Sequence, residues 1–362
     1  MNEQATSEPI DEGAVWSEFC DRLKAAGEKV LAASPDDPFD RAEGLRYLSR
    51  LTHHFLRTSI DEADPASATV SSGGVKIGLD NPDYVYTGAR LSSQYEYVLS
   101  GQMGDAAMLG IGLYSGALGT PKGLVCDAYR TSDEIERNQD GSFEIILAAE
   151  ERPGNWIQMG EETNSLNIRQ TLLRRSEQTP ASFTLARRDA GGAPAPLEPE
   201  QFLQTLDRVG AMVGGIVGQF LGWTASFQAH QHEVRGLSPE LLAVAQGDPN
   251  TSYNYSYWEI AEDEAFVLDL IPPPCDYWNL QIGNHWLESL DYMNRTTHVN
   301  HETAVAEPDG SVRIVIAARD PGCANWLDTA GHRRGALALR FVGAQGEPTL
   351  PTSRVVSLAE LA

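Results

Sequence analysis

The pattern of hydrophobic and polar positions divides the chain into helical and strand-like stretches. Apolar residues recur at helical spacing in residues 13–34, 40–60 and roughly 200–232. In the second stretch the apolar face consists of Leu45, Leu48, Leu51 and Phe55. The intervening and following residues form short apolar/polar alternations separated by Gly, Pro, Asn and Asp, which is typical of antiparallel strands.

The strand-like stretches occur twice. DGSFEIILAAEERPGNW begins at Asp140, and DGSVRIVIAARDPGCANW begins at Asp309, 169 residues later. In both copies an Asp-Gly turn leads into an alternating strand, and a Pro-Gly turn then leads to Asn-Trp. The copies extend over roughly residues 84–175 and 253–343. The shared pattern indicates a duplicated β unit, in which the Trp packs at one end and the Asn holds a turn.

These elements predict an α+β fold: two tandem antiparallel β-sandwich (jelly-roll-like) units, N-terminal helices and a long helix between the repeats. We expect four regions: an N-terminal helical region, the first β-sandwich repeat, a linker with the long helix, and the second β-sandwich repeat. Their predicted bounds are 1–65, 66–188, 189–235 and 236–362.

The long helix contains an almost uncharged segment, residues 208–227, that allows two interpretations. Four glycines recur at every fourth position and line one face with small residues, which would let another element approach closely: Gly210, Gly214, Gly218 and Gly222. The segment is as long as a short membrane span, but Gln219 interrupts it and no basic flank follows. The composition therefore favours a buried helix over a span.

Charge narrows the choice of partners. The chain has 27 Lys and Arg residues against 51 Asp and Glu residues, for a formal net charge of −24. Such a surface repels nucleic-acid phosphates and anionic lipid, so we expect neither nucleic acid nor membrane as a partner. The 4 cysteines form no CxxC pair, and the acidic N-terminus lacks the features of a signal peptide. These features predict a cytoplasmic protein.

Common cofactor and catalytic motifs are missing. The glycines of LGIGLYSG do not have dinucleotide-binding spacing, and the chain contains neither a phosphate-binding P-loop nor a G-x-S-x-G motif. The histidines lack the spacing that favours a shared metal. We therefore expect no cofactor and no metal.

The stretch richest in polar and aromatic residues lies in the second copy, at residues 276–301. Its counterpart in the first copy consists mainly of small residues and has few aromatic or charged side chains. Enrichment of one copy indicates either a ligand pocket or an oligomer interface, because both favour Trp and Tyr. A small-molecule ligand and a homo-oligomer are both compatible with this sequence.

Four motifs resemble the bacterial domain-of-unknown-function 1214 family: AEGLRYLSRL, DNPDYVYTGARL, WLESLDYMNRTTHVNHE and DPGCANWLDTAGH. The resemblance covers most of the chain. It implies a β-sandwich with accessory helices and no established activity. Tyr84 departs from the family pattern at a position that is often small and polar. The polar positions that the resemblance carries onto this chain are Arg46, Asn81, Asp83, Glu288, Ser289, Asp291, Asn300, Asp320, Asn325, Trp326, Asp328 and His332.

Two functions remain open. In the first, the chain is an enzyme of hydrolase or lyase type that acts on a small organic or sugar-like substrate, with His285 or His332 as acid or base. In this hypothesis Asp291 or Asp328 orients the histidine. In the second, the chain is a non-catalytic module that binds a small molecule or a carbohydrate on an aromatic floor of Trp278, Trp286 and Trp326, or an oligomeric interaction protein. The further ligand-binding candidates of the second copy are Trp278, Asn284, Trp286 and Glu288.

Overall fold

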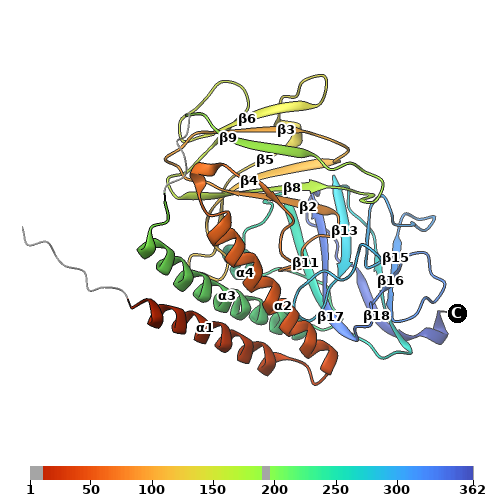
Figure 1. Cartoon of the computed structure of the whole chain (residues 1–362). Coiled ribbons are helices and arrows are strands. Elements are labelled where there is room, and N and C mark those ends of the chain that lie inside the picture. Colours follow the sequence, from red (N-terminus) through yellow and green to blue (C-terminus); the bar gives the residue numbers. More distant parts are fainter. Residues whose placement is uncertain (1–10, 190–195, 362) are drawn as a thin grey trace, which may run out of the picture.

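A computed structural model describes residues 11–189 and 196–361 (Figure 1). The helices are α1 (Glu12–Ala33), α2 (Pro38–Leu56), α3 (Pro199–Gln228) and α4 (Pro239–Val244), with short helical turns at η1 (Arg57–Asp61), η2 (Pro65–Ser67), η3 (Ser132–Glu134) and η4 (Leu358–Glu360). The carboxylates of Asp11 and Asp37 cap α1 and α2, and Pro38 occupies the first position of α2. Each cap satisfies a backbone N–H that has no partner inside the helix.

The first repeat consists of two facing sheets. Its inner sheet has the strand order β1-β2-β8-β4-β5, and its outer sheet has the order β7-β6-β3-β9. The strands are β1 (Ser71–Ser72), β2 (Tyr84–Arg90), β3 (Tyr97–Gln102), β4 (Met108–Gly116), β5 (Leu124–Thr131), β6 (Ser142–Ala148), β7 (Trp156–Gln158), β8 (Thr163–Thr171) and β9 (Ser182–Arg187). Alternate side chains of both sheets form one buried core.

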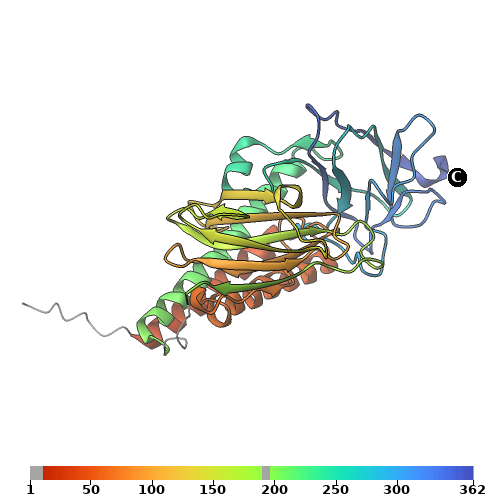
Figure 2. The ribbon, with the colours of Figure 1, turned by 90° about the horizontal axis from the view of Figure 1, so that it is seen from above.

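The second repeat has the same topology. Its inner sheet is β10-β11-β17-β13-β14, and its outer sheet is β16-β15-β12-β18. The strands are β10 (Arg235–Gly236), β11 (Thr251–Glu259), β12 (Glu264–Leu270), β13 (Tyr277–Ile282), β14 (His298–Asn300), β15 (Val312–Ala317), β16 (Trp326–Asp328), β17 (Arg334–Val342) and β18 (Thr352–Ser357). Each strand of the first repeat thus has a counterpart, which confirms the duplicated β-sandwich-like unit and the α+β class. Figure 2 shows the two sandwiches side by side.

The Asn-Trp turns have the same structure in both repeats. Asn155 donates to the carbonyls of Glu136 and Glu144, and its side-chain oxygen accepts from the Glu136 N–H. Asn325 makes the corresponding bonds to Val305 and Arg313. Each following Trp donates its indole N–H to the preceding strand, at 3.1 Å to Ala148 and 2.9 Å to Ala317. These side chains close the sandwich turns, as the duplicated sequence predicts.

The long helices pack beside the inner sheets (Figure 1). A third core forms where α1, α2 and α3 meet the inner sheet of the second repeat. The buried face of α2 differs from the sequence-based expectation. Leu45 is exposed, because this face runs through Gly44, Tyr47, Leu51 and Phe55. An added Cβ at Gly44 would lie 2.5 Å from the Trp286 ring, so this helix approaches closely at a glycine.

The glycine stripe of α3 packs only in part. Gly210 faces Phe19 and Arg22 of α1, whereas a Cβ added at Gly214, Gly218 or Gly222 would meet nothing within 4 Å. The close contact of α3 instead falls on Gly215, where the Gly119 carbonyl occupies the Cβ position. The prediction that the whole stripe faces another element is therefore wrong. Among the described residues, we find no helix with the length and hydropathy of a membrane span.

Candidate functional site

A cavity of about 400 Å³ lies between the inner sheets of the two repeats. Strands β2, β4 and β8 form one wall, β11 and β17 form the opposite wall, and α3 and residues 54–80 and 237–247 contribute further lining. The residues selected from the sequence are absent from its lining. The position between the duplicated units explains the difference, because the cavity belongs to neither repeat alone.

Strand alternation orients the polar lining. Ile168 of β8 is fully buried in the first sandwich core, so its neighbour Arg169 projects from the opposite face into the cavity. Tyr86 of β2 pairs directly with Arg169, and Arg90 stands four residues further along β2 on the same face. The inner sheet of the first repeat therefore presents two guanidinium groups to one cavity.

The duplication supplies a matching arginine from the second repeat. Tyr253 of β11 pairs with Arg340 of β17 just as Tyr86 pairs with Arg169. The tyrosine hydroxyls accept from the backbone N–H five residues earlier, at Asn81 (3.0 Å) and Asp248 (2.9 Å). Each of these residues precedes a proline and begins a tight turn, in NPDYVY and DPNTSY. A repeated Asx-Pro turn thus places a Tyr–Arg pair on each wall.

Of the four arginines of this lining, Arg57 pairs with Glu62, and the other three differ in their partners. Arg340 is 5% exposed and donates to Gln281 Oε1 at 2.6 Å and to the Leu79 carbonyl. Arg169 donates to the Tyr114 hydroxyl at 2.7 Å. Within residues 11–189 and 196–361, neither Arg90, Arg169 nor Arg340 has a carboxylate within 4 Å. In a protein of net charge −24, these cations face the cavity without a counter-ion.

The acidic groups of the lining already have partners. Glu62 lies 3.6 Å from Arg57. Asp80 accepts from the Ser289 N–H at 2.9 Å and from its hydroxyl at 2.7 Å, although burial raises the pKa of the Asp80 carboxyl. Glu62 therefore pairs with Arg57, and Asp80 bonds to Ser289 and interacts at longer range with Lys76 and Arg340, so neither forms an ion pair within 4 Å of Arg90 or Arg169.

His54 lines the cavity near Arg57 and Arg90. Burial, followed by the repulsion of these two arginines, lowers the pKa of His54 to about 4. The imidazole is consequently neutral at neutral pH and leaves the positive charge of this end to arginine. At the other end, burial raises the pKa of Tyr114 to about 12 despite the nearby Arg169, so the phenol stays protonated.

The remaining lining is mostly apolar. Phe55, Leu79, Leu118 and Phe220 line the cavity together with Trp223. Trp223 is 5% exposed, and its indole N–H has no hydrogen-bond partner in the described part of the chain. An apolar cavity with a few cationic groups and a free donor suits a small amphipathic anion.

The second-copy residues selected from the sequence separate into several networks. In the first, Asn284 donates to Glu288 at 2.9 Å and to Glu43 at 3.3 Å. Arg46 and Arg50 neutralise Glu43 and Glu288 at 2.5 Å and 2.6 Å. Burial raises the pKa of Glu288, but every carboxylate has a cation. This network fastens α2 to the second repeat.

A second buried network joins the two repeats beside the cavity. Asp83 accepts from the Tyr277 hydroxyl at 2.6 Å and from Asn300 at 2.9 Å, and it lies 3.1 Å from His298. Asn81 accepts from Asn279 at 2.8 Å. Because these polar groups bond to one another across the repeats, they hold the cavity walls in register.

The predicted His–Asp pairs do not form. His285 Nδ1 lies 2.8 Å from the Tyr257 hydroxyl, and His332 Nδ1 lies 3.0 Å from the Thr329 carbonyl. Burial lowers the pKa of His285 to about 4 and also lowers that of His332. Asp291 accepts from Asn294, and Asp328 pairs with Arg295 at 2.6 Å.

The predicted aromatic floor is dispersed. Trp278 packs in the second sandwich core, and Trp286 packs beneath α2, where it donates to the Asp40 carbonyl at 2.9 Å. Trp326 packs on the outer sheet, and Asp320 accepts from Gly322 within the Pro-Gly turn. These residues lie in separate cores and do not share one surface. No group of three metal-binding side chains is found among the described residues.

Comparison with known proteins identifies the family. The sequence pattern described as "Protein of unknown function (DUF1214)" matches residues 86–172 and again residues 264–346. The chain belongs to the DUF1214 family. Both DUF1214 segments fall on the repeats, so the duplication seen in the strand order is a duplication of this domain. No curated protein matches the chain.

Two solved structures resemble this DUF1214 protein along nearly all of its length. An uncharacterised protein from Burkholderia cenocepacia is 42% identical, with a TM-score of 0.92, covering 96% of this chain and 98% of that chain. The VPA0106 protein from Vibrio parahaemolyticus is 14% identical, with a TM-score of 0.50, covering 93% and 100%. The second likeness concerns the fold alone.

The site residues predicted from the sequence rest mainly on differences between the two copies, and the cavity residues are not among those differences. The decisive residues instead recur in both: Arg169 in SLNIRQT and Arg340 in LALRFV occupy equivalent places in the two repeats, and Arg340 interrupts an otherwise apolar strand. A lone arginine at the same place in two buried strands is costly unless it has a partner, so this repetition was the available signal.

Proposed function

We propose that this DUF1214 protein binds a small organic anion with an apolar body in the cavity between its repeats. The observation that carries the proposal is that, in the described part of this strongly acidic chain, no carboxylate lies within 4 Å of Arg90 or Arg169. An unpaired cation away from bulk water is unfavourable, and a carboxylate ligand would remove that cost. The planar guanidinium fork also matches a carboxylate in shape.

The charge distribution supports selectivity as well as affinity. A surface of net charge −24 repels anions at a distance, so the arginines must act at close range after a ligand enters. The apolar lining then contributes roughly 25 cal/mol for each Å² of apolar ligand surface that it covers. Small hydrophilic anions gain little from that lining, which favours carboxylates that carry a hydrocarbon body.

Acid–base catalysis by His285 or His332 remains a prediction without support from the cavity, because neither imidazole lines it. The lining histidine is His54, which is neutral at neutral pH and close to Arg90. Binding is therefore the better-supported activity. The cytoplasmic location, the jelly-roll-like description of the strand connections and a homo-oligomeric state also stay predictions.

A thermal-shift experiment tests the proposal. We expect octanoate, but not glucose or a divalent metal, to raise the melting temperature; at 100 times its dissociation constant a ligand adds about 2.7 kcal/mol. The double variant Arg90→Gln/Arg169→Gln should remove the shift, because it takes away both unpaired cations, and Arg130→Gln, an exposed arginine on β5, should retain it. Stabilisation by glucose alone, or an octanoate shift that survives in the double variant, would contradict the proposed ligand class.

A further inference from the structure

The two unpaired arginines of the first repeat lie at separate ends of the cavity. Tyr86 pairs with Arg169 and Arg90 pairs with Ser165, so the two arginines are four residue steps apart along neighbouring strands. At roughly 3.3 Å per residue this is about 13 Å between their positions on the sheet. A single carboxylate is small compared with this spacing.

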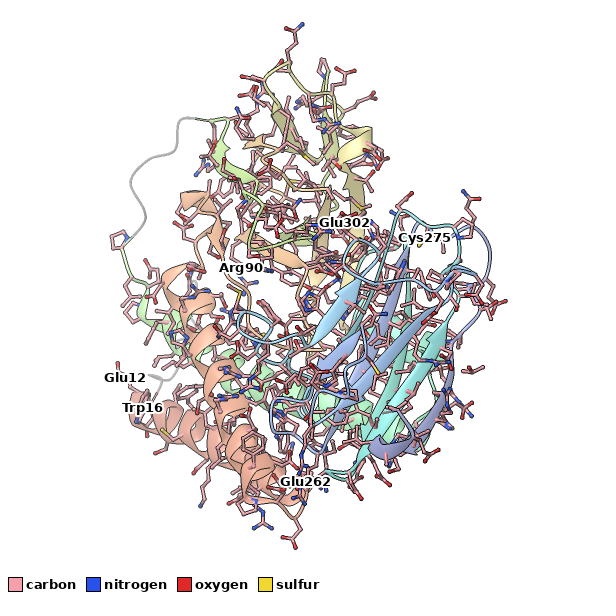
Figure 3. The ribbon with its side chains drawn as sticks, turned by 90° about the vertical axis from the view of Figure 1, so that its right-hand side faces the viewer. Glu12, Trp16, Arg90, Glu262, Cys275 and Glu302 are labelled. Carbon is pink, nitrogen blue, oxygen red and sulfur yellow. The ribbon has the colours of Figure 1, made fainter. Side chains whose placement is uncertain are left out.

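The side chains also lean toward different strands. Arg169 bonds to Tyr114, whose ring folds over Gly112 of β4; an added Cβ at Gly112 would lie 2.6 Å from the Tyr114 hydroxyl. The guanidinium of Arg169 is thus held on the β4 side of β8. Arg90 stands on β2, which borders β8 on its other side. Figure 3 shows Arg90 between the first sandwich and the helices.

The electrostatic surroundings of the two arginines do not overlap. Tyr114, Tyr129 and Tyr253 surround Arg169, and we call this the tyrosine end. His54 and Arg208 lie near Arg90, the Arg57–Glu62 pair lies beside His54, and we call this the histidine end. Each end therefore holds its own positive charge, and an anion bound at one end leaves the other unpaired.

Apolar and uncharged groups lie between the ends. Gly88 separates Tyr86 from Arg90 on β2, and Asn167 separates Ser165 from Arg169 on β8. Phe220 and Trp223 of α3 add apolar surface to the lining, where they contact Gly78 and Tyr255. The middle of the cavity thus suits a hydrocarbon segment, and the two ends suit acidic groups.

We propose that the ligand is a dicarboxylic acid with an apolar middle, with one carboxylate at Arg169 and the other at Arg90. This inference rests on the proposed function, because it assigns the two ends of the same cavity. One carboxylate at each end gives both arginines of the first repeat a counter-ion. A monocarboxylate satisfies one arginine only.

Matched acids test the inference. Isothermal titration of the wild-type protein with alkanedioates from butanedioate to dodecanedioate should give an optimal length. At that length the diacid should bind at least about tenfold more tightly than the alkanoate of equal carbon number. Equal affinities for the two acids would overturn the diacid inference and leave the anion-binding function intact. Failure of both acids to bind would overturn both.

Substitutions of single arginines test whether one carboxylate of the diacid binds at each end of the cavity. Arg90→Gln should lower diacid affinity to that of the matched monoacid, because the second carboxylate loses its partner. Arg169→Gln should do the same from the opposite end, and Arg130→Gln should keep the wild-type preference. If Arg90→Gln keeps a full diacid preference while its melting temperature matches that of wild type, the second carboxylate does not lie at the histidine end.

Discussion

Arg169 and Arg340 occupy the same place in the two repeats, yet they have different surroundings. Arg340 is 5% exposed and bonds to Gln281 and to the Leu79 carbonyl. Among the residues that the structure describes, Arg169 bonds only to the Tyr114 hydroxyl, and it faces the cavity. The segment that carries Leu79 bonds directly to the second arginine, whereas its counterpart before β11 bonds to Tyr114, through the Gly247 carbonyl, and leaves Arg169 facing the cavity. Duplication thus supplied one arginine that holds structure and one that is available to a ligand.

The largest expected effect on stability is the difference between substitutions of Arg340 and of Arg169. Arg340→Met leaves the buried acceptors of Gln281 and Leu79 without a donor, so we expect a loss of roughly 2–5 kcal/mol of unfolding free energy. Arg169→Met removes a cation without a counter-ion and should change stability by less than about 1 kcal/mol. Urea unfolding measures both. Equal losses would show that the two arginines have the same structural role.

The Asn-Trp turns offer a smaller test of the same comparison. Asn325 is 5% exposed, whereas Asn155 is more accessible, although both make the same three hydrogen bonds. Asn325→Ala should therefore cost roughly 2–3 kcal/mol and Asn155→Ala about 1 kcal/mol, because water replaces lost bonds more easily at the exposed turn. Thermal unfolding of the two variants checks the order, and a larger loss in Asn155→Ala would contradict it.

The sequence predicts the architecture better than it predicts the site. Alternating strands and repeated turns predicted the duplicated sandwich, because local patterns of that kind follow from strand geometry. The cavity depends on how the repeats face each other, and no local pattern encodes that. The polar richness of residues 276–301 indicates either a ligand pocket or an oligomer interface, but much of it forms buried networks with α2 and with residues 80–83. Composition alone does not separate a satisfied polar network from an unsatisfied one.

His54 and His285 extend the comparison to protonation. The pKa of each is lowered to about 4, chiefly by burial, but His54 lines the cavity and His285 bonds to Tyr257. Because the unfolded state binds a proton near pH 6.5 and the folded state does not, each histidine destabilises the folded protein as pH falls from 6.5 toward 4.

At pH 7.5, His54→Gln should therefore leave stability nearly unchanged, whereas His285→Gln should cost about 1 kcal/mol through the weakened contact with Tyr257. At pH 5, His54→Gln should be more stable than wild type by about 1–2 kcal/mol, because the variant no longer lets the unfolded state gain that proton. Substitution of the neighbouring His53, which is exposed, is the matched control and should show no such gain. Chemical denaturation at the two pH values measures the difference. If His54→Gln gained no more unfolding free energy at pH 5 than the His53 control, the pKa of His54 would not be lowered in the folded protein. The histidine end would then carry positive charge on His54 as well as on arginine.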